Sequence, residues 1–188
     1  MSETKPEVEF WFDPICPWTW ITSRWAAEVA EARQFEVLWR PFSLQVLNEG
    51  HDSGDHAEGH RQGHRMGRVI VAARQLYGDE VVGKLYAALG RRIHNEGRSD
   101  YDAIITEALG EAELSGQTDL AADDASFDAE LTESTRAGID RVGPGVGIPI
   151  ISIDGTAFFG PVVSPGPRGD EALKLWDGIY AAASVPGF

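Results

Sequence analysis

The sequence predicts an α/β protein whose single sheet is assembled from two separated parts of the chain. Three observations support this. Residues 8–40 show a strand, a helix and a strand in succession. Residues 43–142 show helical periodicity without a convincing strand, and residues 150–183 return to two strands and a final helix. The predicted order is therefore βαβ, a helical insertion, and ββα.

The first unit begins with residues 8–12, which are apolar on both alternations apart from Glu9. This pattern is typical of a central strand covered on both faces. A helix follows from Pro17 to about Arg33, with apolar side chains at spacings of three and four. Residues 35–40 alternate again and predict a second strand. Short links between the three elements indicate a right-handed unit with parallel strands.

The middle of the chain predicts an α-helical insertion of four or five helices. Ser99 and Asp102 have the spacing of a capping box, which marks the start of one of them. Because strand signals resume afterwards, this segment is an insertion and not a terminal domain. Apolar periodicity places helices over residues 65–77, 81–93, 101–112 and 126–142.

Strand signals return after a glycine-rich linker at residues 143–147. Residues 150–153 and 156–159 are apolar runs joined by Asp154 and Gly155, a strong hairpin signal. Residues 170–183 then form a final amphipathic helix.

This order of elements is that of the thioredoxin fold with an inserted α-helical domain. We therefore expect a thioredoxin-like domain from residues 1–42 and 143–188, and an insertion over residues 43–142. The length of 188 residues suits one such core fold with an insertion.

Composition excludes several classes of partner. The formal net charge of −14 opposes binding to nucleic acid and to anionic membrane surfaces. A polar N-terminus predicts no signal peptide, and no run approaches the roughly 20 apolar residues of a membrane span. One cysteine cannot form an intrachain disulfide. We therefore expect a reducing, cytoplasmic compartment.

The single cysteine, Cys16, lies four residues after the last residue of the first predicted strand, past Asp13 and Pro14. Pro17 suits the first position of a helix, so Cys16 becomes the residue that caps it. Free N–H groups and the helix dipole at that position favour a thiolate and predict a lowered thiol pKa. The N–H and hydroxyl of Thr19 are placed to donate to the sulfur. A lone cysteine is otherwise most often a small buried hydrophobe.

A cysteine and a proline opening a long helix after a strand is the layout of a thioredoxin-like redox site, with Thr19 in place of a second cysteine. Pro149 opens the third strand, and local sequence leaves open whether its peptide bond is cis or trans. In a thioredoxin-like fold this proline lies beside the reactive sulfur. Ile148 before it should then make the surroundings of the thiol drier, which raises a thiol pKa. This effect opposes the helix dipole, and the sequence does not decide between them.

Tryptophans and histidines supply further candidates. Trp18 lies inside the cysteine motif and is expected to shelter the site or to stack on a substrate, whereas Trp20 and Trp25 are expected in the core. His94 either caps the C-terminus of a helix or faces the site from the inserted helices.

Four other histidines fall in a polar, glycine-containing stretch: His51, His56, His60 and His64. His60 and His64 have the spacing of two metal ligands on one helix face. No cysteine accompanies them, so a solvated loop leading into a helix is the favoured interpretation, and no metal site is predicted.

Eight segments, in order along nearly the whole chain, resemble the mycothiol-dependent nitroreductase family, a branch of the DsbA-like thioredoxin superfamily. They are residues 10–14 (FWFDP), 16–18 (CPW), 20–25 (WITSRW), 92–95 (RIHN), 146–149 (VGIP), 157–161 (AFFGP), 167–169 (PRG) and 174–177 (KLWD). Two positions depart from the family pattern. Thr19 replaces the second cysteine, and Ile148 replaces a threonine.

The resemblance implies a thiol–disulfide oxidoreductase that works through Cys16 with a low-molecular-weight thiol, mycothiol or in its place glutathione, as co-substrate. It also implies a cis peptide bond before Pro149. Disulfide or nitro compounds are the expected substrates, and no bound cofactor is expected. The implied site comprises the nucleophile Cys16, the motif residues Pro17, Trp18 and Thr19 that stabilise its thiolate, and the thiol- or substrate-binding residues Ile148, Pro149 and His94.

Two alternative functions stay open at this stage. Kappa-class glutathione transferases and hydroxychromene-carboxylate isomerases share this core and insertion and use one key residue at the position of Cys16. A redox-inactive binding protein is the other alternative, and Thr19 is the feature that favours it. The sequence also leaves open whether the chain forms a homodimer.

Overall fold

The computed structural model describes residues 5–51, 54–114 and 117–188. Its centre is a four-stranded sheet in the order β2-β1-β3-β4. Strands β1 and β2 run parallel and β3 and β4 form an antiparallel hairpin, as predicted. The antiparallel pairing of β1 with β3 joins the two units into one sheet. The strands are β1 (Val8–Phe12), β2 (Val37–Pro41), β3 (Ile150–Ile153) and β4 (Thr156–Phe159).

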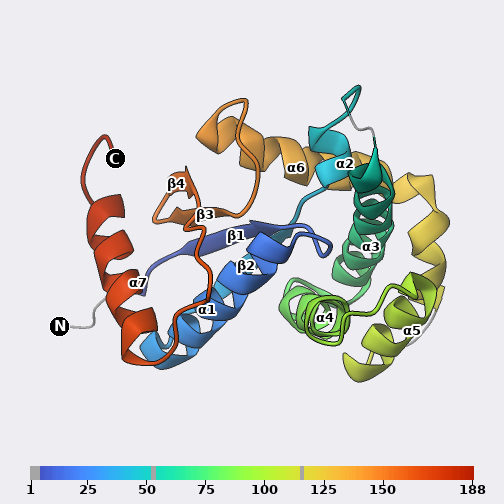
Figure 1. Cartoon of the computed structure of the whole chain (residues 1–188), viewed down its shortest axis with the longest axis horizontal. Helices are drawn as coiled ribbons and strands as arrows, with labels where there is room; N and C mark the ends of the chain where they lie inside the picture. The colour runs from blue at the N-terminus through green and yellow to red at the C-terminus, as the bar shows by residue number, and fades with distance from the viewer. Residues whose placement is uncertain (1–4, 52–53, 115–116) are drawn as a thin grey trace.

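Helices cover both faces of this sheet (Figure 1). On one side α1 (Pro17–Arg33) and α7 (Asp170–Ala183) pack against the face that carries Phe10 and Ile151. On the other side α6 (Asp128–Val142) packs against the face that carries Trp11 and Ile150. Every residue of β1 is buried, and β1 lies between β2 and β3. The prediction of a central strand covered on both faces is therefore confirmed.

Apart from α6, the inserted helices lie beside the sheet (Figure 1). The described residues between 43 and 142 contain no strand, as predicted. The proposed boundary between core domain and insertion stays a prediction, since α6 belongs to the insertion by sequence yet covers the sheet. The inserted elements are α2 (Leu44–Leu47), α3 (Asp55–Tyr77), α4 (Glu80–Gly90), a π-helical turn (Arg91–Asn95), α5 (Tyr101–Glu111) and two 3₁₀ turns (Gln117–Asp123 and Ala125–Phe127).

The histidine-rich stretch is helical over most of its length, so its interpretation as a solvated loop was wrong. Helix α3 begins at Asp55, ten residues before the predicted start. His64 lies on the buried side of α3. On the same helix Gly59 and Gly63 face Ile15 and Asp13, in the segment between β1 and α1, and Gly67 faces Leu131 of α6, so α3 lies close to both. Packing thus stabilises a segment that lacks the apolar residues by which a helix is usually recognised. Residues 52–53, also in this stretch, lie outside the described part of the chain.

Two details of other inserted helices differ from prediction. Helix α5 begins at Tyr101, as predicted, but the capping box at Ser99 is wrong, because Asp100 is the N-cap and its carboxylate instead pairs with Arg98. The helix predicted over 81–93 changes to a π-helical turn after Gly90. A Cβ at Gly90 would lie 2.3 Å from ring atoms of Trp20, so this glycine allows α4 to pack closely against α1.

No helix in the described residues is long and apolar enough to cross a membrane.

Candidate active site

Cys16 lies at the junction of β1 and α1, where the sequence placed it. It is the N-cap of α1 with an extended backbone, φ −79° and ψ 114°, and Pro17 opens the helix. Its N–H donates to the carbonyl of Asp13 at 3.0 Å, and its own carbonyl accepts from the N–H of Trp20 at 3.0 Å. The turn between strand and helix therefore holds the cysteine backbone from both sides.

The thiol of Cys16 is nearly enclosed, with 7% of the residue exposed. Its apolar neighbours include Trp11, Phe42 and Ile148. Burial raises the pKa of Cys16, and the nearby charge of Asp13 adds to that effect. The prediction of a lowered thiol pKa was therefore wrong. Desolvation of the thiolate outweighs the favourable groups at the helix start.

Thr19 lowers the pKa of Cys16, as predicted, but by less than burial raises it. Its hydroxyl and its N–H both lower the pKa of Cys16, with the N–H of Trp18 contributing less. The Thr19 side chain is fully buried, and its hydroxyl has no partner in regular hydrogen-bond geometry. The position usually taken by a second cysteine thus holds a small polar group enclosed beside the sulfur.

The peptide bond between Ile148 and Pro149 is cis, as the resemblance implied. Ile148 is buried and packs in the same apolar cluster as Cys16. The carbonyl of Pro149 accepts a hydrogen bond from the N–H of Gly160 at 2.8 Å, which joins this segment to the end of β4. Residues distant in sequence, Cys16 and Ile148, are thereby brought together.

Two of the three tryptophans of α1 lie in the core, as predicted, and the third is exposed. Trp20 and Trp25 are buried, with indole N–H groups that donate to the side chain of Asn95 at 2.8 Å and to the carbonyl of Ala172 at 3.0 Å. Trp18 is 50% exposed, directly beside Cys16 in the chain. It is therefore available to contact a molecule that approaches the thiol.

His94 faces the cysteine turn from the inserted helices. Its Nε2 lies 2.8 Å from the carbonyl oxygen of Pro14, and its ring stacks on Trp20 with centroids 5.7 Å apart. A carbonyl oxygen only accepts, so Nε2 carries the hydrogen. Burial lowers the pKa of His94 and favours its neutral form. The interpretation of this ring as a helix cap was wrong, because its nitrogen bonds the cysteine turn.

Asp13 is a site residue that the sequence analysis did not single out. Its carboxylate is fully buried and accepts from the N–H groups of Ile15 at 3.1 Å and Leu44 at 2.8 Å. Burial raises its pKa to about 6 despite those hydrogen bonds. The available signal was an acidic residue directly after a strand that is apolar except for Glu9, three residues before the cysteine. A charge at such a place needs a structural or chemical reason.

A second buried polar group joins the sheet to the inserted helices. The hydroxyl of Ser43 lies 2.8 Å from Nδ1 of His64, and Nε2 of His64 lies 2.8 Å from Asp128. Ser43 is fully buried and caps α2 by accepting from the N–H of Val46, so its role is structural. Both ring nitrogens of His64 are occupied. Among the described residues no three or more His, Cys, Asp or Glu side chains are grouped to hold a metal.

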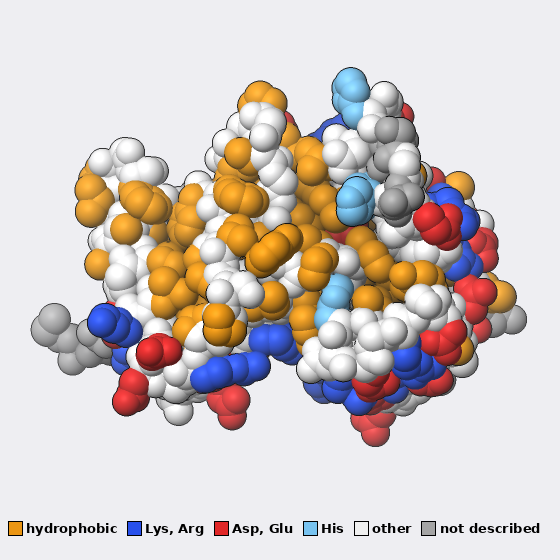
Figure 2. All heavy atoms as spheres, viewed as in Figure 1, with side chains coloured by type: hydrophobic (Ala, Val, Ile, Leu, Met, Phe, Trp, Pro, Cys, Tyr) orange, Lys and Arg blue, Asp and Glu red, His pale blue; other side chains and the backbone are white. Residues whose placement is uncertain are grey.

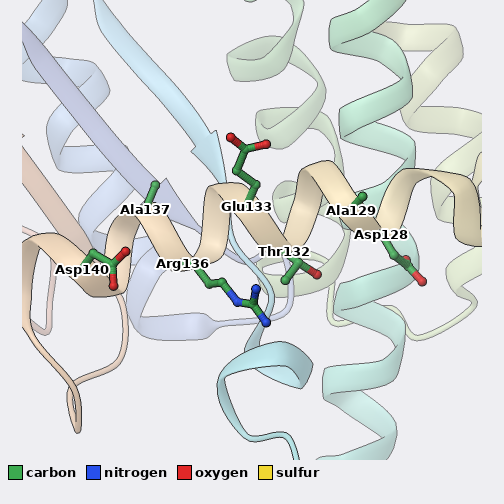
Figure 3. Close-up of a pocket in the computed structure, with 7 residues that line it drawn as sticks. All are labelled: Asp128, Ala129, Thr132, Glu133, Arg136, Ala137 and Asp140. Carbon is green, nitrogen blue, oxygen red and sulfur yellow. The ribbon is translucent and has the colours of Figure 1, made fainter.

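A surface hollow of about 580 Å³ lies along α6 (Figure 3). All seven of its lining residues belong to that helix, among them Asp128, Arg136 and Asp140. None is a predicted site residue, and none is a nucleophile with a neighbouring base.

Comparison with known proteins agrees with this geometry. The family model described as mycothiol-dependent nitroreductase Rv2466c matches residues 15–188. The chain belongs to this family. A relative in Mycobacterium tuberculosis, the uncharacterized protein Rv2286c, is 30% identical over 186 residues, covering 95% of this chain and 78% of the relative.

Solved structures share the fold at low sequence identity. The probable DsbA oxidoreductase SCO1869 of Streptomyces coelicolor is 18% identical with a TM-score of 0.61, covering 95% of this chain and 89% of its own. The cytosolic disulfide reductase DsbM of Pseudomonas aeruginosa, solved with GSH, is 17% identical with a TM-score of 0.59, covering 93% and 99%. These structures show that the chain has the DsbA-like thioredoxin fold. Its membership of the mycothiol-dependent nitroreductase family makes it an oxidoreductase with a thiol-dependent redox function.

Proposed function

We propose that this protein is a one-cysteine thiol oxidoreductase that uses a low-molecular-weight thiol of the mycothiol type and works in the reducing cytoplasm. The observation that carries the proposal is the position of Cys16, which caps α1 beside the cis Ile148–Pro149 bond and has no cysteine partner. The family description supports mycothiol as the thiol, and the DsbM structure with GSH supports glutathione as its substitute.

The reaction proceeds through a mixed disulfide. The thiolate of Cys16 attacks one sulfur of a substrate disulfide, forms a new S–S bond, and releases the other sulfur as a thiolate that takes up a proton. A thiolate of the small thiol then attacks the Cys16 sulfur and releases the second half of the substrate. A second small thiol attacks its bound counterpart, which leaves as the disulfide of the small thiol and restores Cys16. Two thiols are oxidised and one disulfide is reduced.

Each proposed site residue has a role in this cycle. Pro17 sets the start of the helix, and the N–H groups of Trp18 and Thr19 stabilise the thiolate. The backbone of Ile148, before Pro149, pairs with the peptide-like part of the bound thiol. His94 holds the turn before the cysteine through Pro14, so it acts by positioning.

The raised pKa of Cys16 determines the protonation state of its thiol before any substrate binds. Near neutral pH most of the Cys16 population is the uncharged thiol, because burial and the charge of Asp13 both disfavour the thiolate. The resting cysteine therefore reacts slowly with oxidants in general. Exchange depends on the minor thiolate fraction and quickens as the pH rises toward the thiol pKa.

Mass spectrometry of the intact protein tests the proposal. Wild type incubated with mycothiol disulfide, or with glutathione disulfide, gains the mass of one thiol on Cys16, and added free thiol removes it. The control is Cys16→Ser, which keeps the helix cap because serine also caps helices and gains no mass. An absence of thiol uptake by folded wild type at pH 8 and above would contradict the one-cysteine mechanism.

A thiol-dependent transferase or isomerase is the second candidate. The observation that favours it is the enclosed, uncharged Cys16 next to the Thr19 hydroxyl, a pair that offers hydrogen bonds to a bound thiol without exchanging with it. This candidate predicts that Cys16→Ser retains most of its glutathione-dependent isomerisation of a model substrate. Loss of that activity together with loss of thiol uptake supports the oxidoreductase.

A further inference from the structure

A small hollow of about 160 Å³ lies one helical turn beyond the cysteine site. Trp20, Ile21 and Arg24 line it from α1, Asn95 lines it from the π-helical turn, and Arg168 from the segment before α7. Figure 1 shows α1 between that segment and α4, and Figure 2 shows basic side chains where these elements meet. The hollow thus combines apolar walls with two guanidinium groups, in a protein whose net charge is −14.

Arg24 combines partial burial with the lack of a carboxylate partner. Among the arginines of the described residues, only Arg24 and Arg136 have no carboxylate within 4.0 Å, and Arg136 is exposed to solvent on α6. Arg24 is half-buried. Its Nε donates to the hydroxyl of Ser23 at 3.2 Å, and its guanidinium lies 4.3 Å from the centre of the Trp20 ring.

The charge of Arg24 is disfavoured mainly by burial, which lowers its pKa. Tyr86 acts in the opposite direction, and the neighbouring Arg168 lowers the pKa further. An arginine stays protonated in proteins, so the charge persists without a carboxylate to offset the loss of water. Arg168 is partly offset by Glu28, at 2.9 Å. The remaining positive charge of the hollow is therefore that of Arg24.

We infer that this hollow binds the anionic group, a carboxylate or a phosphate, of a small organic ligand. The planar guanidinium of Arg24 presents several N–H donors suited to paired oxygens of either group. The amide oxygen of Asn95 accepts from Trp20, which leaves the N–H groups of the amide to donate. The rings and side chains of Trp20 and Ile21 provide an apolar wall for the body of the ligand.

The position of the hollow relates it to the thiol. Cys16, Trp20 and Arg24 succeed one another at intervals of four along α1, so the Cα atoms of Cys16 and Arg24 are separated by about 12 Å along the helix axis. The Arg24 guanidinium lies over the ring of Trp20, the intermediate residue of this series. A ligand about as long as that axial separation, about 12 Å, would thus reach both places. Anion binding requires no redox step, so this inference goes beyond the proposed function and can fail or hold separately from it.

An NMR titration of the full chain tests the inference. ¹⁵N-labelled protein is titrated with benzoate, with the uncharged benzamide, and with inorganic phosphate, while the indole N–H of Trp20 is followed. We expect saturable shifts with benzoate or phosphate and none with benzamide. Response to benzoate alone identifies a carboxylate ligand, and response to phosphate alone identifies a phosphate ligand.

Variants locate the binding group. Arg24→Gln should weaken anion binding at least tenfold, in line with a lost charge-assisted hydrogen bond, and Arg24→Lys should retain part of it. Arg136→Gln removes the same charge from the other arginine without a carboxylate partner and should leave binding unchanged. If Arg24→Gln is poorly folded, Arg168→Gln provides the comparison, with a smaller loss expected. Equal binding of benzamide, equal losses in the Arg24 and Arg136 variants, or no binding of either anion would overturn the inference.

Discussion

His94 in the inserted helices donates from Nε2 to the carbonyl oxygen of Pro14, two residues before the cysteine, at 2.8 Å. The same ring stacks on Trp20, four residues after it. One side chain from the insertion therefore contacts both ends of the segment that carries Cys16.

We predict that His94→Ala lowers the free energy of unfolding by about 1–3 kcal/mol, the combined size of one hydrogen bond and one aromatic contact. Urea denaturation followed by tryptophan fluorescence measures this. His51→Ala, at an exposed position, is the matched control and should change stability by less than about 0.5 kcal/mol. Equal stability of the two variants would mean that the contact to Pro14 contributes nothing.

Asp13 makes stability depend on pH. Its pKa is raised from 3.8 to about 6 in the folded protein, so folding favours the protonated form. Its contribution is fully present below pH 3.8 and is lost as the pH rises through about 6. The loss amounts to roughly 3 kcal/mol at neutral pH. Relative to wild type, Asp13→Asn should therefore gain about that much unfolding free energy between pH 4 and pH 7. A difference that stays constant over this range would exclude a raised carboxyl pKa.

The same substitution should change the reactivity of Cys16. Removing the negative charge of Asp13 removes one of the causes that raise the thiol pKa. Wild type should be alkylated by iodoacetamide with a midpoint above the free-thiol value of about 8.5. Asp13→Asn should shift that midpoint downward and react faster at pH 7. A wild-type midpoint below the free-thiol value would mean that the groups at the start of α1 affect the pKa of Cys16 more than burial does.

Gly63 is required by the position of Asp13. A Cβ at residue 63 would lie 2.3 Å from Oδ1 of Asp13, whereas a Cβ at Gly59, one turn earlier on α3, would make an ordinary 3.7 Å contact with Ile15. We predict that Gly63→Ala destabilises the protein by about 1–3 kcal/mol through overpacking. Gly59→Ala should be neutral or stabilising by up to about 1 kcal/mol, the helix propensity gained. Thermal unfolding of the pair decides this. Similar values for both would refute the close packing.

Thr19→Cys should restore a two-cysteine redox site. A cysteine at this buried position lies in the same helical turn as Cys16, within the separation that a disulfide spans. After treatment with oxidised dithiothreitol, mass spectrometry should show an internal disulfide, with two hydrogens lost. Thr22→Cys, at a buried position farther along α1, is the control and should form none. A disulfide in neither variant would place residue 19 away from the sulfur.

The sequence by itself determined the order of elements and the position of the cysteine. The apolar run of β1, the Asp154-Gly155 turn and the proline after Cys16 are local signals, and each depends on a few adjacent residues. They were enough to predict the βαβ and ββα units, the cap position of Cys16 and the core location of Trp20 and Trp25. The family followed from motifs spread along the chain.

Tertiary structure alone decided the chemistry around the thiol. The pKa of Cys16 depends on how completely Ile148, Phe42 and Trp11 remove water from it, and these residues are far apart in the sequence. The helix dipole is a local effect that a sequence reveals, whereas desolvation is a property of the assembled site. For the same reason the sequence did not reveal the burial of Asp13 or the place of Arg24 in a hollow. Both depend on how the inserted helices pack against the rest of the chain.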